Sequence, residues 1–540
     1  MTDKSLTLMP EDIQRIMGKD AQRNNILAAR MVAEVVKTTL GPKGMDKMLV
    51  SPTGEIIVTN DGVTILDEMQ IEHPAAKMMV EIAKTQESEV GDGTTTAVMI
   101  AGKLLENAEK LLDKKIHPTV ITKGYRLAAE KSQEILKEVA LRITSDNEDV
   151  LRQVAMTAMT GKGAEDSRER FADIIVRAVK QVQEDGKIDI ENIKIEKSKG
   201  DGIKDTELIS GVIIDKERVS QDMPKKVNGA KIALIDFPLE LRNPEITTKI
   251  SISTPDQLQS FLHEEERVIK DMIEKVKLSG ANVLFCQKGI DDFAQYLLAK
   301  EEIYACRRVA KSDMEKISKA TRGRIVSNLS ELTPFELGDS EKVESVKHGE
   351  DYFTHIGGCK NPKALTILIH GGTSHVIDEI ERALKDGLGD VICSLESGLV
   401  VPGGGAIEME LAKRLREFSQ ELSGREQLAI EEFASALEFI PSTLAENAGV
   451  DPIDVLTELK SRHDAGEKSA GLNLFTNKVE NVLEARIIEP LKIKIQAISS
   501  ASEVAIMILR IDDVIASNTK KGSMKNVGPG MGMSGMSPLD

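Results

Sequence analysis

The sequence predicts a large multidomain protein in which helical segments at the two ends flank a central α/β segment. Apolar residues recur at helical spacing through about the first 150 residues and again between about residues 407 and 516. Between about residues 196 and 361, short β-like runs alternate with amphipathic helices, which is typical of an α/β unit with a partly parallel sheet. The 540 residues are enough for three or four domains of roughly 150 residues each.

This order of segments is compatible with two arrangements. The chain forms either three domains in a row or one helical domain that is interrupted by an α/β insertion. In the second arrangement two connecting segments form a hinge region, and glycines follow predicted strands at residues 371–372 and 403–405. Glycine has the backbone freedom that a bending connection needs, but the same residues also make ordinary turns. The pattern alone leaves both arrangements open.

The N-terminal segment is predicted to begin with a helix over residues 21–40, because an apolar stripe runs along it until a Gly-Pro pair stops it. A short strand over residues 55–59 then leads into an Asn-Asp-Gly turn. Further helices are expected over residues 73–89 and from residue 97 onward, on either side of a break that is rich in Gly and Thr.

The central segment is predicted to hold four short strands with helices between them. The strands are expected at residues 231–235, 282–286, 303–306 and 324–327, and the helices at residues 291–300 and 312–320. This alternation of strands and helices predicts that the strands pair, in part, side by side in one direction.

An excursion over about residues 241–277 interrupts the central unit. Its helix has a start signal of its own, with Thr254 as N-cap, Pro255 at the first helical position and Gln257 as the capping-box partner. The helix carries a broad apolar stripe, which predicts an interaction surface. The tail from residue 520 is rich in Gly, Met and Ser and is predicted to be disordered.

Composition excludes several classes of protein. The net charge of −17 repels nucleic acid and anionic membrane surfaces, so we expect neither as a partner. The four cysteines are too few for a disulfide framework and too widely spaced for a zinc module. No apolar run approaches the roughly 18 residues of a membrane span, and the N-terminus lacks a signal-peptide pattern. We therefore expect an acidic, soluble protein of the cytoplasm.

The most informative motif is the turn at residues 91–96 (GDGTTT), which leads into a helix. A glycine-rich turn at a helix N-terminus presents backbone N–H groups at the positive end of the helix dipole, and the three Thr hydroxyls add donors. The pattern fits a phosphate-binding cradle in which Asp92 reaches the phosphates through a bridging Mg²⁺. It also fits an ordinary helix start with Asp92 as the N-cap residue.

Four other features are weaker signals. They are the turn at residues 41–44 (GPKG), residues 60–64 (NDGVT), Lys162 between two glycines, and Asp386 on the polar face of a helix. Each has an ordinary structural explanation when it is taken alone. The sequence contains neither a Walker motif nor the kinase motifs, so any nucleotide chemistry must rest on carboxylates, glycines and hydroxyls.

Taken together, the motifs resemble the nucleotide-site sequences of chaperonins. The resemblance rests on residues 41–48, 59–64, 91–98 and 401–406, which occur in the order of that family. Residues 161–165 (GKGAE) and 509–515 (LRIDDVI) are similar to the group II branch, the archaeal thermosome and its eukaryotic cytosolic relatives. The resemblance covers nearly the whole chain. It departs at Gly387, where the family usually has alanine, and at Ile493, where valine is usual.

The resemblance implies the chaperonin fold, in which a mainly α-helical equatorial domain is interrupted by an α/β intermediate domain and an α/β apical domain with a helical protrusion. The implied boundaries are residues 1–145 and 404–540 for the equatorial domain, 146–214 and 368–403 for the intermediate domain, and 215–367 for the apical domain. The excursion at residues 241–277 would be a built-in lid that replaces a separate co-chaperonin. The implied partners are identical or paralogous subunits, in two stacked rings of about eight, and non-native polypeptides.

The resemblance also implies an ATPase site that uses ATP and Mg²⁺. Asp92 would hold the Mg²⁺, while Asp61 and Asp386 would orient and activate the attacking water. Lys162 would sense the γ-phosphate by its charge. The other implied nucleotide-binding residues are Gly41, Pro42, Gly44, Gly93, Thr94, Thr95, Thr96, Gly404, Gly405, Asn473 and Glu489, with the last two near the base and ribose.

Two other functions are alternatives to an ATP-driven folding machine. A small-molecule phosphotransferase could use the same aspartate and glycine chemistry, but it would need a small polar substrate cleft. The α/β segment instead carries an amphipathic excursion without a catalytic cluster. A passive holdase would show no ATPase activity at all. We therefore expect an ATP-dependent chaperone.

Overall fold

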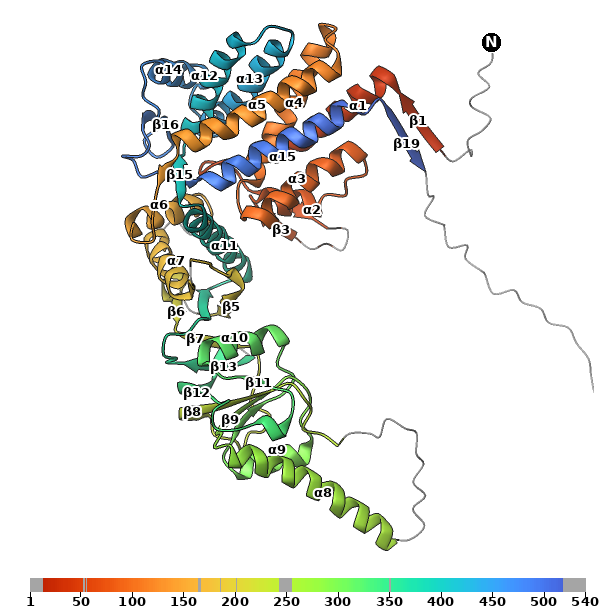
Figure 1. The fold of residues 1–540 in the computed structure, drawn as a ribbon, viewed down its shortest axis with the longest axis vertical. Coiled ribbons are helices and arrows are strands. Elements are labelled where there is room, and N and C mark those ends of the chain that lie inside the picture. The colour runs from red at the N-terminus through yellow and green to blue at the C-terminus, as the bar shows by residue number, and fades with distance from the viewer. Residues whose placement is uncertain are drawn as a thin grey trace, which may run out of the picture.

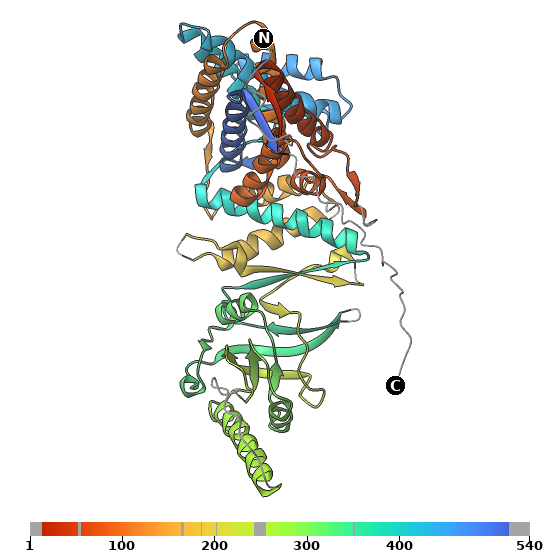
Figure 2. The same ribbon diagram turned by 90° about the vertical axis from the view of Figure 1, so that its right-hand side faces the viewer.

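The computed structural model describes residues 13–517 except residues 52, 53, 55, 164–166, 185, 201, 242–254, 349 and 350. Three bodies are stacked along the long axis of the molecule: a helical body, a smaller middle body and an α/β body (Figures 1 and 2). The predicted order of helical, α/β and helical segments is confirmed. No described helix is long and apolar enough to cross a membrane.

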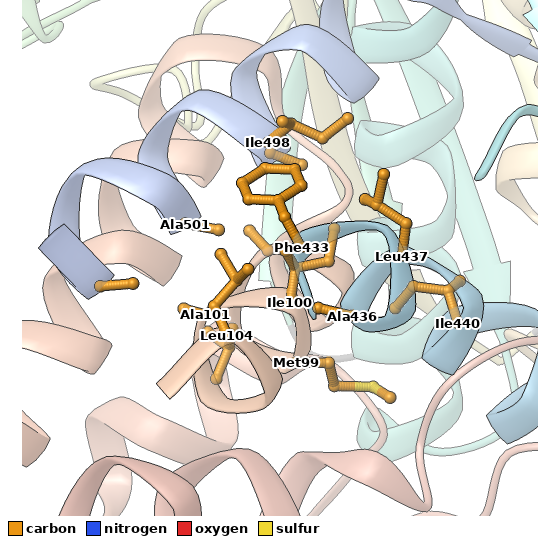
Figure 3. Packing of buried hydrophobic residues seen from close by; sticks show 14 of the residues in the cluster. Met99, Ile100, Ala101, Leu104, Phe433, Ala436, Leu437, Ile440, Ile498 and Ala501 are labelled. Carbon is orange, nitrogen blue, oxygen red and sulfur yellow. The ribbon is translucent and has the colours of Figure 1, made fainter. Parts of the chain in front are cut away.

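The helical body is built from both ends of the chain. Its helices are α1 (Gly18–Lys37), α2 (Gly62–Glu68), α3 (Pro74–Val90), α4 (Thr94–Asp113), α5 (Pro118–Val139), α12 (Ala406–Glu421), α13 (Glu426–Asn447), α14 (Pro452–Asp464) and α15 (Leu491–Leu509). Figure 3 shows Ile100 of α4 packed with Phe433 of α13 and Ile498 of α15 in one hydrophobic core. The structure therefore has the interrupted arrangement, because segments that are some 300 residues apart share this core.

The middle body is a three-stranded sheet covered by helices. Strand β14 (Leu365–Gly371) lies between β5 (Ile193–Lys199), to which it is parallel, and β6 (Glu207–Ile209), to which it is antiparallel. Helices α6 (Glu148–Ala158), α7 (Arg168–Val182) and α11 (Ser374–Ser397) pack with this sheet around a second core. Helix α11 runs along the helical body in both views, and so carries residues of the middle body to that junction (Figures 1 and 2).

The α/β body contains a mixed sheet. Its strands follow the order β10 (Tyr304–Cys306), β9 (Val283–Cys286), β8 (Lys226–Ile235), β12 (Gly338–His348), β13 (Asp351–Gly357) and β7 (Gly211–Ile214), with β11 (Ile325–Val326) paired to β8. Strands β8, β9 and β10 run in parallel, while β12 and β13 pair in the antiparallel direction. Helices α9 (Asp292–Lys300) and α10 (Lys311–Thr321) and all four expected strands fall where the sequence predicts them.

Helix α8 (Pro255–Leu278) forms most of the described part of the predicted excursion. Figure 1 shows it projecting from the end of the α/β body that is farthest from the helical body. Its last turns are not part of the projection, because Ile269, Ile273 and Val276 are buried in the core of the α/β body. The predicted N-cap Thr254 and the tail from residue 520 lie outside the described residues.

Two small antiparallel strand pairs stand at the surface of the helical body. One joins β1 (Ile13–Met17) to β19 (Asp513–Ser517), near the two ends of the described chain, and the other joins β2 (Lys47–Val50) to β3 (Ile56–Thr59). The second pair exposes Met48, Val50, Ile56 and Val58. Short two-stranded sheets with exposed apolar side chains are only marginally stable on their own.

Candidate functional site

A cavity of about 370 Å³ lies where the helical and middle bodies meet, a volume within the usual range for small-molecule sites. Most of the predicted site residues form its wall. They are Gly41, Pro42, Asp61, Asp92, Gly93, Thr94, Thr95, Thr96, Lys162, Gly404, Gly405 and Glu489. Gly44, Asp386 and Asn473 do not line it among the described residues.

The turn at residues 91–96 places a helix N-terminus in the cavity wall. Gly91 and Gly93 both have a φ of +79°, and Gly93 is the N-cap residue of α4. Asp92 does not cap the helix, because its Oδ1 accepts a hydrogen bond from Gly93 N at 2.7 Å. No side chain among the described residues caps α4. The first-turn N–H groups therefore face the cavity without a side-chain acceptor, which favours the phosphate-binding interpretation over the ordinary helix start.

Asp61 is held at the start of the short helix α2. Its Oδ2 accepts hydrogen bonds from the backbone N of Thr64 at 2.9 Å and from the Thr64 hydroxyl at 2.6 Å. A Cβ atom at Gly62 would lie 2.7 Å from the Thr95 hydroxyl, so α2 abuts the first turn of α4. This packing fixes a carboxylate beside the turn at residues 91–96.

Gly44 lies behind the cavity and shapes the turn that follows α1. A Cβ atom there would lie 2.3 Å from the carbonyl oxygen of Thr39, so only glycine fits. Its backbone N donates to the Gly41 carbonyl at 2.9 Å, which closes the turn that brings Gly41 and Pro42 to the cavity.

Lys162 lies between carboxylates of the two bodies. Its Nζ is 2.5 Å from Oδ2 of Asp386 in its own body and 3.7 Å from Oδ1 of Asp92 in the helical body. Burial opposes the charge on Lys162, but Asp386 and Asp92 outweigh burial and raise its pKa. Burial raises the pKa of Asp386 to about 6, although Lys162 acts in the opposite direction. Asp386 therefore does not line the cavity itself, but it forms an ion pair with Lys162, which does.

A small apolar cluster packs α11 against the turn at residues 91–96. It consists of Val90 at the end of α3, Cys393 on α11 and Ile493 on α15. The Cys393 thiol donates to the carbonyl oxygen of Val90 at 3.6 Å. A Cβ atom at Gly93 would lie 2.7 Å from Ile493, so Ile493 packs directly beneath the turn.

The opposite end of the cavity is formed by the hairpin of β16 (Ala470–Asn473) and β17 (Lys478–Asn481) and by the start of α15. Asn473 is engaged within the hairpin, where its Nδ2 donates to Glu480 Oε1 at 2.5 Å and its Oδ1 accepts from Phe475 N at 2.9 Å. The neighbouring Leu472, Leu474 and Phe475 reach the cavity instead. Asn473 therefore shapes this end of the cavity without lining it.

Glu489 belongs to a buried charge network. Lys494 donates to Glu489 Oε2 and, at 2.8 Å, to Glu408 Oε1. The Lys494 and Glu408 side chains are 10% and 2% exposed. One ammonium group thus neutralises two carboxylates, of which only Glu489 lines the cavity.

Sequence reasoning missed several residues of the cavity wall. Asp390 lines it from α11, one helical turn after Asp386, a spacing of four that could have pointed to it. Arg168, at the start of α7, lines it as well and lies over the ring of Phe475, 5.3 Å from its centroid. Lys494 had no sequence signal, because its buried partner Glu408 lies 86 positions away in the chain.

The residues present fit a Mg²⁺–nucleotide. Mg²⁺ prefers carboxylate oxygens and usually takes one or two of them, together with substrate phosphates and waters. Asp92 supplies such a carboxylate beside the first turn of α4. In the part of the chain that the structure describes, no three acidic, histidine or cysteine side chains converge into a complete protein cage. The site therefore suits a cation that arrives with phosphates.

A helix N-terminus, acidic side chains and a lysine meet in a cavity at the junction of two bodies, an arrangement that fits a multidomain nucleotide-binding protein. The chain belongs to the TCP-1/cpn60 chaperonin family, whose model matches residues 32–519. It is 56% identical to a thermosome subunit of Methanopyrus kandleri over 517 residues, which cover 95% of each chain. It is 54% identical to a thermosome subunit of Methanocaldococcus jannaschii, with 99% of both chains covered.

A solved chaperonin structure is also similar to this chain. The chain is similar to the open-state monomer of a group II chaperonin from Methanococcoides burtonii, with 47% identity and a TM-score of 0.58. The match covers 78% of this chain and all of that one. The predicted resemblance and the chaperonin fold are thus confirmed, and by family the chain is an ATP-dependent chaperone and an ATPase.

Proposed function

We propose that the chain is a subunit of a double-ring group II chaperonin whose cavity hydrolyses ATP and so drives a built-in lid to close over non-native polypeptides. The observation that carries the proposal is the position of Lys162 between Asp386 of the middle body and Asp92 of the helical body. A ligand that attracts Lys162 changes the contact between the two bodies. Nucleotide chemistry and domain movement thereby act on the same group.

The phosphates would bind at the first turn of α4. The N–H groups and hydroxyls of Thr94, Thr95 and Thr96 are the donors, and the turn at Gly41 and Pro42 approaches from the other side. Asp92 would hold Mg²⁺, which when bound withdraws negative charge from the phosphates. The terminal phosphate would then compete with Asp386 for the ammonium group of Lys162.

Hydrolysis would depend on two carboxylates. Asp61 orients the attacking water from the helical body, and Asp386 accepts its proton once Lys162 turns to the γ-phosphate. The pKa of about 6 leaves Asp386 ionised at neutral pH, as a proton acceptor must be. Because the two carboxylates belong to different bodies, the reaction would be complete only when those bodies are close together.

The sugar and base would occupy the opposite end of the cavity. Glu489 would accept hydrogen bonds from the ribose hydroxyls, and Gly404 and Gly405 would border the nucleotide. A Cβ atom at Gly404 would lie 2.7 Å from the carbonyl oxygen of Leu472, so glycine there permits close approach of the chain. Asn473 would act indirectly, by holding the turn that presents Phe475.

The proposed domains follow the three bodies. Residues 1–145 and 404–540 would form the equatorial domain, 146–214 and 368–403 the intermediate domain, and 215–367 the apical domain. Assembly into two stacked rings of identical or paralogous subunits, about eight in each, is supported by the exposed strand pairs of the helical body. Such pairs offer both unpaired edges and apolar side chains to a neighbouring subunit.

The lid would be the projecting part of α8 with the segment before it, which makes a separate co-chaperonin unnecessary. The rings would act in the cytoplasm on non-native polypeptides, without nucleic acid or membrane partners. We propose a lid of about residues 241–264, a part of the expected 241–277, because Ile269, Ile273 and Val276 further along α8 are buried in the α/β body.

The test combines particle size with protection of a client. Negative-stain images of the purified chain should show double rings, and an aggregation-prone unfolded protein should become protease-resistant only during ATP hydrolysis. A monomer that phosphorylates a small molecule would establish the phosphotransferase alternative. Protection that is identical with and without ATP would establish a passive holdase, and either result would overturn the proposal.

A further inference from the structure

Asp390 is a buried carboxylate in the cavity wall, and one of its two oxygens has no hydrogen-bond partner in the described part of the chain. It lies on α11, is 2% exposed and forms part of the cavity wall. Its Oδ1 has no hydrogen-bond partner among the described residues. Burying a carboxylate without compensating partners is costly, so most buried polar atoms are paired. The arrangement indicates that Oδ1 meets its partner when the cavity is filled.

The surroundings of Asp390 restrict what that partner can be. The charged groups with the strongest influence on it are Asp92, Lys162, Asp386 and Glu489, of which three are acidic. Burial and these acids raise the pKa of Asp390, and a phosphate oxygen would raise it further, whereas a hydrogen-bond donor or a cation would stabilise the carboxylate. Lys162 is already engaged by Asp386 and Asp92. The partner must be a hydrogen-bond donor or a cation that the ligand brings.

A hydrated Mg²⁺ satisfies these conditions. The cation usually keeps several waters when it binds to a carboxylate and phosphates, and those waters are hydrogen-bond donors. Direct coordination by Asp390 together with Asp92 and a third acid is not favoured, since no such group converges in the described part of the chain. A water between the cation and Asp390 requires no such convergence.

We propose that Asp390 accepts, through Oδ1, a hydrogen bond from a water in the hydration shell of the Mg²⁺ that Asp92 holds, and so positions the hydrated cation. The inference rests on the proposed nucleotide site. Asp92 belongs to the helical body and Asp390 to α11, so the hydrated cation links the two bodies. Asp390 is a positioning residue, because it acts on the metal through water.

The test uses the full-length protein with ADP and Mn²⁺ as the probe cation. Free Mn²⁺ is measured by electron paramagnetic resonance, and ADP affinity is measured separately in the presence of EDTA. Asp390→Val should weaken Mn²⁺ binding to the ADP complex by about 10- to 100-fold, the range seen for groups around a metal's ligands. Its ADP affinity in EDTA should equal that of the wild type.

Ser394→Ala is the matched control. Ser394 lies one turn further along α11, is buried, and its Oγ also has no hydrogen-bond partner among the described residues, but it does not line the cavity. Removal of the Ser394 hydroxyl in this variant should leave Mn²⁺ affinity unchanged. Asp390→Val should also melt at a higher temperature than the wild type when no ligand is present, because an uncompensated buried carboxylate is removed.

Three results would overturn the inference: equal Mn²⁺ affinity in Asp390→Val and wild type, an equal loss in Ser394→Ala, or a matching loss of ADP affinity in EDTA. Failure of the proposed function looks different. In that case the wild-type protein itself binds neither ADP nor Mn²⁺.

Discussion

The ammonium group of Lys162 lies 2.5 Å from Oδ2 of Asp386, although the two residues are 224 positions apart in the sequence. One comes from the loop after α6 and the other from α11, and their ion pair faces Asp92 of the helical body at 3.7 Å. In this position Lys162 neutralises the group that we propose as proton acceptor. In the proposed mechanism, a bound phosphate would compete with Asp386 for this lysine.

Replacing Lys162 should change the pH dependence of hydrolysis. A carboxylate accepts a proton only above its pKa, so activity falls as the pH drops through about 6, the pKa of Asp386. Lys162 lowers that pKa in the free enzyme, and Lys162→Met should therefore move the acid limb of the kcat/KM profile up by at least about one pH unit.

Lys385→Met is the control for this experiment. Lys385 is adjacent to Asp386 in the sequence but is exposed and pairs with Glu381 at 2.9 Å. The acid limb of the kcat/KM profile of Lys385→Met should match that of the wild type. An unchanged limb in Lys162→Met would disprove the electrostatic coupling.

Asp92→Ala should weaken binding of Mg²⁺–ATP, because the cation loses its protein ligand. Binding of ATP in EDTA should change little, since the N–H groups of α4 remain. Isothermal titration with and without Mg²⁺ measures both quantities. Equal Mg²⁺–ATP affinity in the variant and the wild type would show that Asp92 is not the ligand.

Lys494→Met should lower the melting temperature more than Glu408→Gln does. The first change leaves Glu408 and Glu489 buried without a cation, and breaking a buried ion pair in this way costs about 3–5 kcal/mol. The second change keeps the pair between Lys494 and Glu489. Thermal melts of the assembled protein compare the two variants, and the opposite order of stability would contradict the network.

The segment at residues 241–264 should be cut readily by protease without nucleotide and protected during ATP hydrolysis. A variant that lacks these residues should still hydrolyse ATP, because no cavity residue lies within them. It should fail to shelter a client. Equal cleavage in both states, or a sheltered client in the deletion variant, would refute the lid assignment.

Much of the cavity wall could be predicted because its turns leave local signatures in the sequence. Gly93 and Gly405 have positive φ angles at the N-caps of α4 and α12, and Gly41 has one in the turn after α1, and such angles favour glycine. Asp390 and Lys494 could not be predicted in this way. Their charged neighbours include Asp92, about 300 residues from Asp390, and Glu408, 86 residues from Lys494. From sequence alone, a charged residue on a helix is expected to face solvent.

Gly44 and Asn473 were predicted from sequence motifs, but neither lines the cavity among the described residues. Both belong to motifs that reach the cavity, but their own atoms support a turn rather than face the ligand. The apolar stripe of the excursion shows a related limitation. The apolar stripe of α8 is continuous in sequence, and only the structure separates its buried turns from its projecting turns.

Single-turnover hydrolysis by Asp386→Ala tests the central claim most directly. The variant should bind Mg²⁺–ATP with wild-type affinity, since Asp386 lies behind the cavity wall, but its chemical step should be slower by about 10²- to 10⁴-fold. Rapid-quench measurement of the bound ATP separates binding from chemistry. A chemical step at the wild-type rate would show that Asp386 is not the proton acceptor and would contradict the proposed coupling between hydrolysis and domain movement.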